Sequence, residues 1–178
     1  MSWPNLTEDF DRVYQHTSYR GHWRKVAHTL TSASFQAVWG YRINHWLVEN
    51  HIPILGEIIQ RFIEVWTGVS IPADTKIGPG LMVLHFGGIV INSSAVIGRQ
   101  CTLHHGATIG NRVSGGPSPR VGDRVMIGAG AKVLGGITIG NDVEIGANAV
   151  VLESLPNGAV AVGVPARVVR VKQPGAAG

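Results

Sequence analysis

Three histidines, His85, His104 and His105, are the residues of this chain best suited to chemistry. An imidazole titrates close to neutral pH, so it can take up or release a proton under ordinary conditions. Metal binding is the alternative use of such a cluster. However, no Asp, Glu or Cys completes a ligand set around the three histidines, and we expect no metal. The cluster therefore favours proton transfer, provided that the fold brings the rings together.

The histidines lie within a repeat of six residues that runs from residue 71 to residue 151. All thirteen positions at this step are aliphatic: Ile71, Ile77, Val83, Ile91, Ile97, Leu103, Ile109, Val121, Ile127, Val133, Ile139, Ile145 and Val151. A period of six fits neither an α-helix nor a free strand. It is typical of a parallel β-helix, in which three sides make a coil and each coil buries its aliphatic residues by stacking on the next. An all-β sandwich is the alternative, which the unbroken repeat disfavours.

The register of the repeat predicts which residues stack. With three steps per coil, one side of the prism carries Val83, Leu103, Ile127 and Ile145. Two places further along lie His85, His105, Ala129 and Ala147, which should form one column with a spacing of about 4.8 Å. His85 and His105 are then neighbours, the two alanines leave a smooth groove, and His104 faces inward or towards the corner.

Residues 1–68 are predicted to be a helical region, with helices near residues 8–16, 23–30 and 35–50 and a last one that ends at Gly68. The apolar stripes of the last two helices are typical of core or subunit contacts. We expect them to cap the open N-terminal end of the prism. The β-helix is expected over residues 69–156, with a loop at 112–120. A C-terminal tail is expected at 157–178, and its polar, glycine-ended part should be frayed.

The composition is that of a globular chain of 178 residues, with 44% hydrophobic and 15% charged residues. The net charge is +4, but no basic run interleaves with aromatic residues, so nucleic acid is not an expected partner. The single cysteine, Cys101, falls on an inward position and excludes an internal disulfide. No apolar run is long enough to span a membrane and the N-terminus is no signal peptide, so we expect a cytoplasmic location.

Several motifs resemble the serine acetyltransferases of the hexapeptide-repeat class. They include Ile77-Gly78-Pro79-Gly80, His85, Gly88-Ile89-Val90-Ile91 and Gly163-Val164-Pro165-Ala166-Arg167, and the resemblance covers roughly residues 35–170. It implies a left-handed β-helix and a homotrimer, with acetyl-coenzyme A, the acyl donor, bound between neighbouring prisms. The long helical domain by which many members pair trimers is mostly missing here.

The resemblance also implies the site. The family's catalytic histidine maps to His85, which would act as general base on an acceptor hydroxyl. His105, its neighbour in the column, is the second catalytic candidate, and it either positions substrate or merely stacks on His85. An extended pantetheine arm fits the alanine groove, with its thioester at the histidine end. The residues expected to bind coenzyme A are Ala129, Gly130, Lys132, Ala147 and Arg167.

Departures from the family pattern fall on the acceptor site. Leu84 replaces an aspartate before the catalytic histidine, Ser70 replaces the aspartate that orients it, and the loop at 112–120 lacks the family's Arg-His pair. Ser70, Leu84, Arg112 and Arg120 are the candidate acceptor-binding residues. We predict that L-serine is a poor substrate and that the acceptor is a small molecule with a neutral hydroxyl, a sugar first.

Other readings stay open. Asp9, Asp11 or Asp74, or Arg112 or Arg120 of a partner subunit, would restore the missing charges from elsewhere. A non-catalytic hexapeptide scaffold and a metal-using β-helix enzyme of the carbonic-anhydrase type are the alternative functions. The retained His85 argues against the scaffold.

Overall fold

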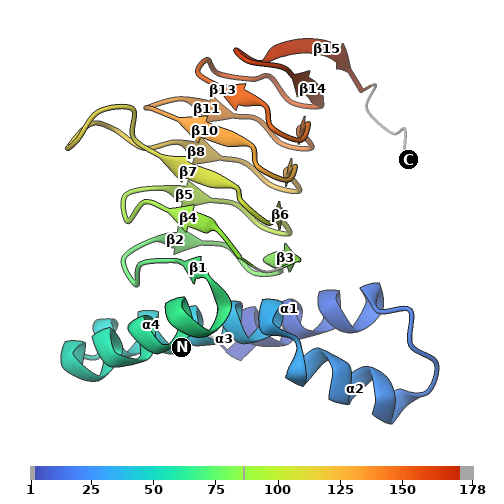
Figure 1. The fold of residues 1–178 in the computed structure, drawn as a ribbon, viewed down its shortest axis with the longest axis vertical. Coiled ribbons are helices and arrows are strands. Elements are labelled where there is room, and N and C mark those ends of the chain that lie inside the picture. The colour runs from blue at the N-terminus through green and yellow to red at the C-terminus, as the bar shows by residue number, and fades with distance from the viewer. Residues whose placement is uncertain (1–2, 86, 173–178) are drawn as a thin grey trace.

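A computed structural model describes residues 3–85 and 87–172, which form a layer of helices beneath an upright prism of strands (Figure 1). The helices are α1 (Trp3–His16), α2 (His22–Thr31), α3 (Ala33–Glu49) and α4 (Pro53–Thr67). Gly68 ends α4 with φ 65°, the left-handed C-terminal cap that the sequence predicts.

The prism has three sides. Sheet A holds β1 (Val69–Ser70), β4 (Ile89–Ile91), β7 (Thr108–Gly110), β10 (Lys132–Leu134) and β13 (Val150–Val151). Sheet B holds β2 (Lys76–Ile77), β5 (Val96–Ile97), β8 (Arg120–Val121) and β11 (Thr138–Ile139). Sheet C holds β3 (Met82–Leu84), β6 (Thr102–His104), β9 (Met126–Ile127), β12 (Glu144–Ile145), β14 (Ala159–Val162) and β15 (Arg167–Val171).

Strands of successive coils pair in parallel, and only β15, which follows β14, runs antiparallel to its neighbour. The predicted left-handed parallel β-helix is confirmed. Its interior is filled by the six-residue repeat, because none of the thirteen step residues is more than 7% exposed. Burial of each such side chain stabilises the fold by about 1.5–3 kcal/mol, so the stacked step residues together form the hydrophobic core of the prism.

Cys101 lies inside this core as predicted. Burial raises the pKa of its thiol to about 11. A thiol in this state is a small apolar side chain and no nucleophile at neutral pH.

A buried ion pair fastens the helices to the first coil. The Arg42 guanidinium on α3 donates to both oxygens of Asp9 on α1, at 2.9 and 3.3 Å. It also donates to the carbonyl oxygens of Ile77 and Gly78, each at 2.7 Å. Asp9 in turn accepts the backbone N–H of Leu81 at 2.8 Å. One pair of side chains thus joins α1, α3 and the corner between β2 and β3.

The outer helix α4 departs from the prediction. We expect its apolar stripe to cap the prism, and Ile63 does pack against the core, but Leu55, Ile58, Phe62 and Trp66 are 47–65% exposed. The physical reason is that α3, whose Val38 and Tyr41 are buried, already occupies the open end of the prism. Helix α4 contacts α3 and the start of β1 instead.

The C-terminal segment, which we expect to follow the β-helix as a tail, extends sheet C instead, and the glycine-ended part that we expect to be frayed lies largely outside the described residues. Residues 159–171 form β14 and β15, because Val160 and Ala161 pair in register with Glu144 and Ile145 and so extend sheet C. Residues 173–178 lie outside the described part of the chain. Among the described residues, no helix combines the length and apolar character that crossing a bilayer requires.

We predict that Asp9→Asn lowers the free energy of unfolding by about 3–5 kcal/mol, because it leaves the buried Arg42 charge without its counterion. Urea unfolding followed by circular dichroism measures this loss. The matched control is Glu8→Gln, which removes the partly exposed pair of Glu8 with Arg99 at 3.1 Å and should cost at most about 1 kcal/mol. Equal losses in the two variants would contradict a special role for the buried pair.

Candidate active site

The histidines gather at the corner where sheet C ends and sheet A begins. Register pairs Val83 with Leu103 and Leu103 with Ile127, as predicted. The corner continues this stacking, because the N–H of His105 donates to the carbonyl of Leu84 at 3.1 Å. The rings of His85 and His105 are perpendicular, with centroids 5.8 Å apart. The contact that the repeat predicts between these two histidines is therefore present.

His85 sits on an enlarged turn. Val83 and Ile91 are eight positions apart where the repeat normally needs six, so the corner holds two extra residues. His85 has φ 55° and is exposed, and the chain then recovers through Gly87 and Gly88, with φ 106° and 68°. Histidine is one of the few non-glycine residues enriched in this left-handed region. The enlarged turn therefore leaves His85 exposed at this corner.

His104 lies beside Leu84 and is partly buried. Burial lowers the pKa of His104, and the charges of His85 and His105 lower it further. No carboxylate contributes to this shift. This environment favours the neutral form of His104. Within the described residues, no set of three His, Cys, Asp or Glu side chains is arranged to hold a metal ion.

Small residues continue the column above the histidines. The carbonyl of His105 accepts the N–H of Gly130 at 2.9 Å, and the carbonyl of Ala129 accepts the N–H of Asn148 at 2.8 Å. Ala129 and Gly130 are partly exposed and Ala147 is exposed. A Cβ added to Gly106 would lie only 3.4 Å from the Cα of Gly130, so these glycines keep the corner narrow. The column predicted from the register thus carries small residues at Gly106, Ala129, Gly130 and Ala147, and the side chain of Asn148 lies against Gly130.

Two cations border this strip of small residues. The Lys132 ammonium donates to the carbonyl of Gly106 at 2.6 Å and to Thr108 Oγ1 at 3.0 Å, which holds it beside the histidine corner. Arg167 lies at the far end of the same corner, because the N–H of Ala166 donates to the carbonyl of Val150. Its guanidinium is exposed and only 3.6 Å from Glu153, a weak surface pair.

The predicted acceptor residues divide into two groups. Ser70 and Leu84 lie in the first coil, near the histidine corner, since a Cβ on Gly68 would meet the Cα of Gly87 at 3.1 Å. The Ser70 hydroxyl donates to Glu64 Oε1 at 2.7 Å. Glu64, on the last turn of α4, is the carboxylate that sequence reasoning missed. No signal could have found it, because the contact depends on how α4 meets β1.

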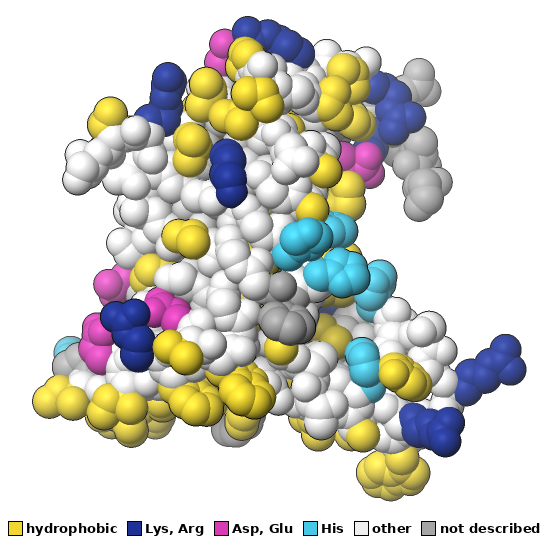
Figure 2. Space-filling view, in the orientation of Figure 1, with side chains coloured by type: hydrophobic (Ala, Val, Ile, Leu, Met, Phe, Trp, Pro, Cys, Tyr) yellow, Lys and Arg dark blue, Asp and Glu magenta, His cyan; other side chains and the backbone are white. Residues whose placement is uncertain are grey.

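The second group lies at another corner. Arg112 and Arg120 flank the loop between β7 and β8, which leaves the corner between sheets A and B. The loop is held there by hydrogen bonds of Asn92 to Asn111 and of Ser118 to Asn92. The loop projects on the left of Figure 1, whereas β3 and β6, which precede His85 and His105, lie on the right, on the side of the largest cyan patch in Figure 2. One chain therefore does not bring these arginines to the histidines.

The structure also shows where the three aspartates lie that were candidates to replace the missing carboxylates. Asp9 is fully buried and paired with Arg42, so it is not available to an acceptor. Asp11 lines a groove between α1 and α3. Asp74 is exposed in the turn between β1 and β2, at the same corner as the loop.

The arrangement as a whole suits one kind of chemistry. An exposed imidazole stands at the end of a narrow strip of small residues, with cations along it. Such a strip can bind an extended anionic ligand and place its reactive end at the imidazole.

Comparisons with known proteins agree with this arrangement. Residues 118–153 match the family described as bacterial transferase hexapeptide (six repeats). A serine acetyltransferase of Mycobacterium tuberculosis is 46% identical over 144 residues, which are 80% of this chain and 63% of that protein. The chain thus spans less than two thirds of that relative's length.

A shorter relative covers almost the whole chain. The serine acetyltransferase of Helicobacter pylori strain J99 is 38% identical over 168 residues, 93% of this chain and 96% of that protein. A solved serine acetyltransferase in complex with CoA superposes with a TM-score of 0.82 at 37% identity, over 92% of this chain and 68% of that one. On these similarities the chain belongs to the serine acetyltransferase family.

Proposed function

We propose that this protein transfers an acetyl group from acetyl-coenzyme A to a hydroxyl of a small acceptor. The observation that carries the proposal is the exposed His85 ring at the end of a strip of small residues bordered by Lys132 and Arg167. The relatives named serine acetyltransferase, one of them solved with CoA, support it.

The proposed reaction needs one base. The neutral imidazole of His85 takes the proton of the acceptor hydroxyl while the oxygen attacks the thioester carbonyl. The tetrahedral intermediate collapses, the carbon–sulfur bond breaks, and the proton passes from the imidazolium to the leaving thiolate. The products are the acetyl ester and free coenzyme A, and no covalent enzyme intermediate is formed. His105, in edge contact with His85, limits the orientations open to that ring.

Coenzyme A is proposed to lie along the corner. Its pantetheine arm would pass the small residues Ala147, Gly130 and Ala129, beside the side chain of Asn148. Its phosphates would meet Arg167, while Lys132 lies closer to the thioester end. Anionic groups gain from such cations because charge-assisted hydrogen bonds are the stronger ones.

We further propose that the site is completed by a neighbour in a homotrimer. Arg112, Arg120 and Asp74 lie at the corner between sheets A and B, away from the histidines of the same chain. Packing that corner of one prism against the histidine corner of the next would bring these charges to the acceptor. The arrangement accounts for charged residues on a loop that has no use within one chain.

Two acceptor classes remain as candidates. A neutral hydroxyl, as on a sugar, is our first candidate, because no carboxylate acts on His104 and Asp9 is occupied by Arg42. Serine is the second, because the relatives carry its name. A zwitterion needs a carboxylate near its ammonium and a cation near its carboxylate. Within one chain Glu64 and Lys132 are the charged groups near the histidine corner, and the neighbour's loop and Asp74 would add others.

We predict that His85→Asn lowers kcat at least ~100-fold, because the amide cannot accept a proton at neutral pH. Asparagine tolerates the positive φ of this position, so the fold should be kept. Steady-state acetyl-coenzyme A consumption and calorimetric coenzyme A binding give the two readouts, and binding should be unchanged.

The matched control is His51→Asn. His51 is also exposed and has φ 61°, but it follows α3, far from the corner. This variant should keep full activity. A His85→Asn enzyme as active as the His51→Asn control would remove the general base.

We also predict that Ala129→Trp abolishes coenzyme A binding, because an indole would fill the strip. Thr138→Trp, on the exposed face of sheet B, is the control and should bind normally. Sedimentation of both variants should give three times the chain mass of 19.0 kDa. Normal affinity in Ala129→Trp would show that coenzyme A does not use this corner, and a monomeric mass would remove the shared site.

The acceptor is decided by kinetics with L-serine. Loss of a charge-assisted hydrogen bond weakens recognition by about 1.5–3 kcal/mol, roughly ten- to a hundredfold. We therefore expect a poor rate with serine and a higher one with a neutral sugar hydroxyl. A KM for serine below about 1 mM would establish serine as the acceptor.

A further inference from the structure

The histidine corner, where sheet C ends and sheet A begins, carries one side chain at a position that is otherwise glycine. In the three coils above the enlarged turn, this corner passes through one left-handed residue per coil: Gly106 and Gly130, both with φ 71°, and Asn148 with φ 56°. These residues stack, because the N–H of each donates to a carbonyl of the coil below at 2.8–2.9 Å. Glycine adopts this conformation at two of the three positions, so the backbone does not require asparagine at the third.

The Asn148 side chain reaches over the strip of small residues. Asn148 is exposed, and a Cβ added to Gly130 would lie 3.3 Å from its Cγ and closer still to its Oδ1. The carboxamide therefore extends from its own coil down over Gly130, towards the histidine end of the strip. Among the described residues, the Asn148 side chain has no hydrogen-bond partner.

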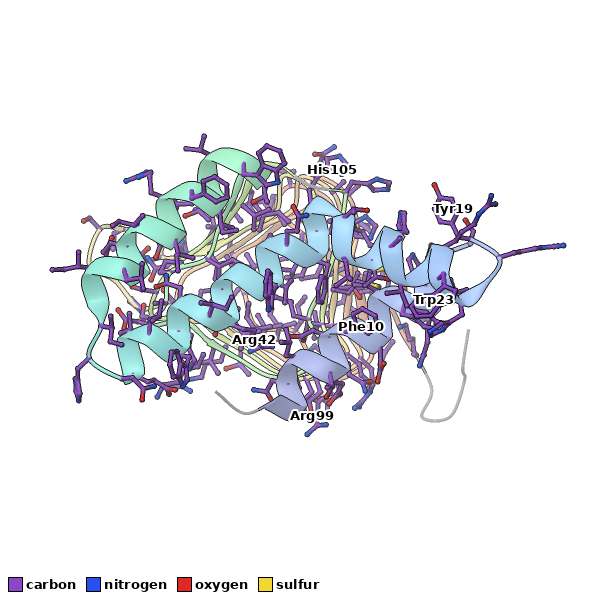
Figure 3. All side chains as sticks on the ribbon, turned by 90° about the horizontal axis from the view of Figure 1, so that it is seen from below. Phe10, Tyr19, Trp23, Arg42, Arg99 and His105 are labelled. Atoms are coloured by element: carbon purple, nitrogen blue, oxygen red, sulfur yellow. The ribbon has the colours of Figure 1, made fainter. Side chains whose placement is uncertain are left out.

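Similar side chains at another corner have a structural role that Asn148 lacks. At the corner between sheets B and C, Asp123 Oδ1 accepts the N–H of Arg99 and Asn141 Oδ1 accepts the N–H of Asp123, each at 2.8 Å. Figure 3 looks along the prism and shows Arg99 and His105 on opposite edges, so the two corners are well separated. The oxygens at the Arg99 corner join successive coils. The carboxamide of Asn148 joins none and is free to bind a ligand.

The height of Asn148 above the histidines matches one group of the pantetheine arm. Asn148 lies two coils above His105, about 9.6 Å at the ordinary strand spacing of about 4.8 Å. The arm has two amides, and the outer one lies seven bonds from the sulfur, roughly 8–9 Å in an extended chain. The inner amide lies three bonds from the sulfur, roughly 4 Å, which is level with Ala129 and Gly130. An extended arm with its sulfur beside His105 thus brings its outer amide to Asn148.

We propose that the Asn148 carboxamide binds the outer amide of the pantetheine arm and thereby helps select the acyl donor. The inference rests on the proposed function, because it requires coenzyme A in this strip. An amide that leaves water for a groove needs a hydrogen-bond partner, and a carboxamide offers both a donor and an acceptor. Lys132, the nearest cation, already donates to Gly106 and Thr108. Thioesters that lack the outer amide gain nothing from Asn148, so the residue favours donors with a full pantetheine arm.

Replacement of Asn148 by glycine tests the contact. We expect Asn148→Gly to raise the KM for acetyl-coenzyme A about three- to tenfold, the effect of one lost neutral hydrogen bond, and to leave kcat unchanged. Glycine already occupies the equivalent positions of the two coils below, so the fold should be kept. Calorimetry should show the same factor in the Kd of coenzyme A, without any acceptor present.

A series of shortened donors locates the contact along the arm. S-acetylpantetheine keeps both amides but lacks the nucleotide, and S-acetyl-N-acetylcysteamine keeps only the inner amide. We expect Asn148→Gly to lower kcat/KM for acetyl-coenzyme A and S-acetylpantetheine by the same factor. It should leave kcat/KM for S-acetyl-N-acetylcysteamine unchanged, because that donor has no outer amide to lose.

The matched control is Gln100→Gly. Gln100 is also an exposed carboxamide in the left-handed region, with φ 55°, but it lies beside Arg99 at the corner between sheets B and C. Its amide donates to Glu8 at 3.1 Å and faces no part of the strip. This variant should keep the KM of the unaltered protein for all three donors.

Three results would overturn the proposal. One is an unchanged KM and Kd in Asn148→Gly. Another is an equal loss with S-acetyl-N-acetylcysteamine, which would assign Asn148 to the fold or to the inner amide. The third is a loss with acetyl-coenzyme A alone, which would place Asn148 against the nucleotide. If the unaltered protein binds coenzyme A but acetylates no hydroxyl acceptor, the proposed function fails by itself, and the two calorimetric Kd values still decide the role of Asn148.

Discussion

The open first coil of the prism is the constraint on which the rest of the structure depends. A stack of coils buries each step residue only if a neighbour covers it, and the first coil has no coil below. Here α3 covers it, and the Asp9–Arg42 pair holds the cover in place. Burial raises the pKa of Asp9, while the hydrogen bonds and charge of Arg42 oppose that shift. The pair is retained although ionic groups are costly to bury, because its hydrogen bonds satisfy backbone groups that a bare coil would leave unpaired.

The interior of the prism was predictable from the sequence because it depends only on the spacing of residues within and between adjacent coils. A step of six residues fixes which side chains point inward, and three steps per coil fix which stack, so the contact of His85 with His105 followed from counting. The enlarged corner was visible for the same reason, as two extra residues before Ile91. Arithmetic of this kind holds wherever each coil contacts only its neighbours.

Contacts between elements that follow no repeat were not predictable. The stripe of α4 has the period of a core helix, and the sequence cannot show that α3 takes the inner place and leaves Phe62 and Trp66 outside. Val160, which pairs with Glu144, lies beyond the last clear repeat position, so the sequence assigns β14 to the tail and not to the β-helix. Glu64 reaches Ser70 only because α4 ends against β1. In each case the deciding fact is a packing angle or a chain reversal, and single-sequence patterns carry no information about either.

The general base and the charged loop lie at different corners of the prism. This separation explains why the sequence motifs identify the base, His85, but not the residues that bind the acceptor. The corner between sheets C and A carries the groups that the proposed chemistry shares across acceptors, namely the imidazole of His85 and the strip over Ala129. The corner between sheets A and B carries the loop, which is free to vary because no step residue of the core lies in it. If a neighbouring subunit's loop determines acceptor specificity, then Ser70 and Leu84 determine which acceptors the histidine corner excludes. Arg112, Arg120 and Asp74 of the neighbour then determine which acceptors are bound. The acceptor is then a property of the assembly, set by charges that a single prism keeps at separate corners.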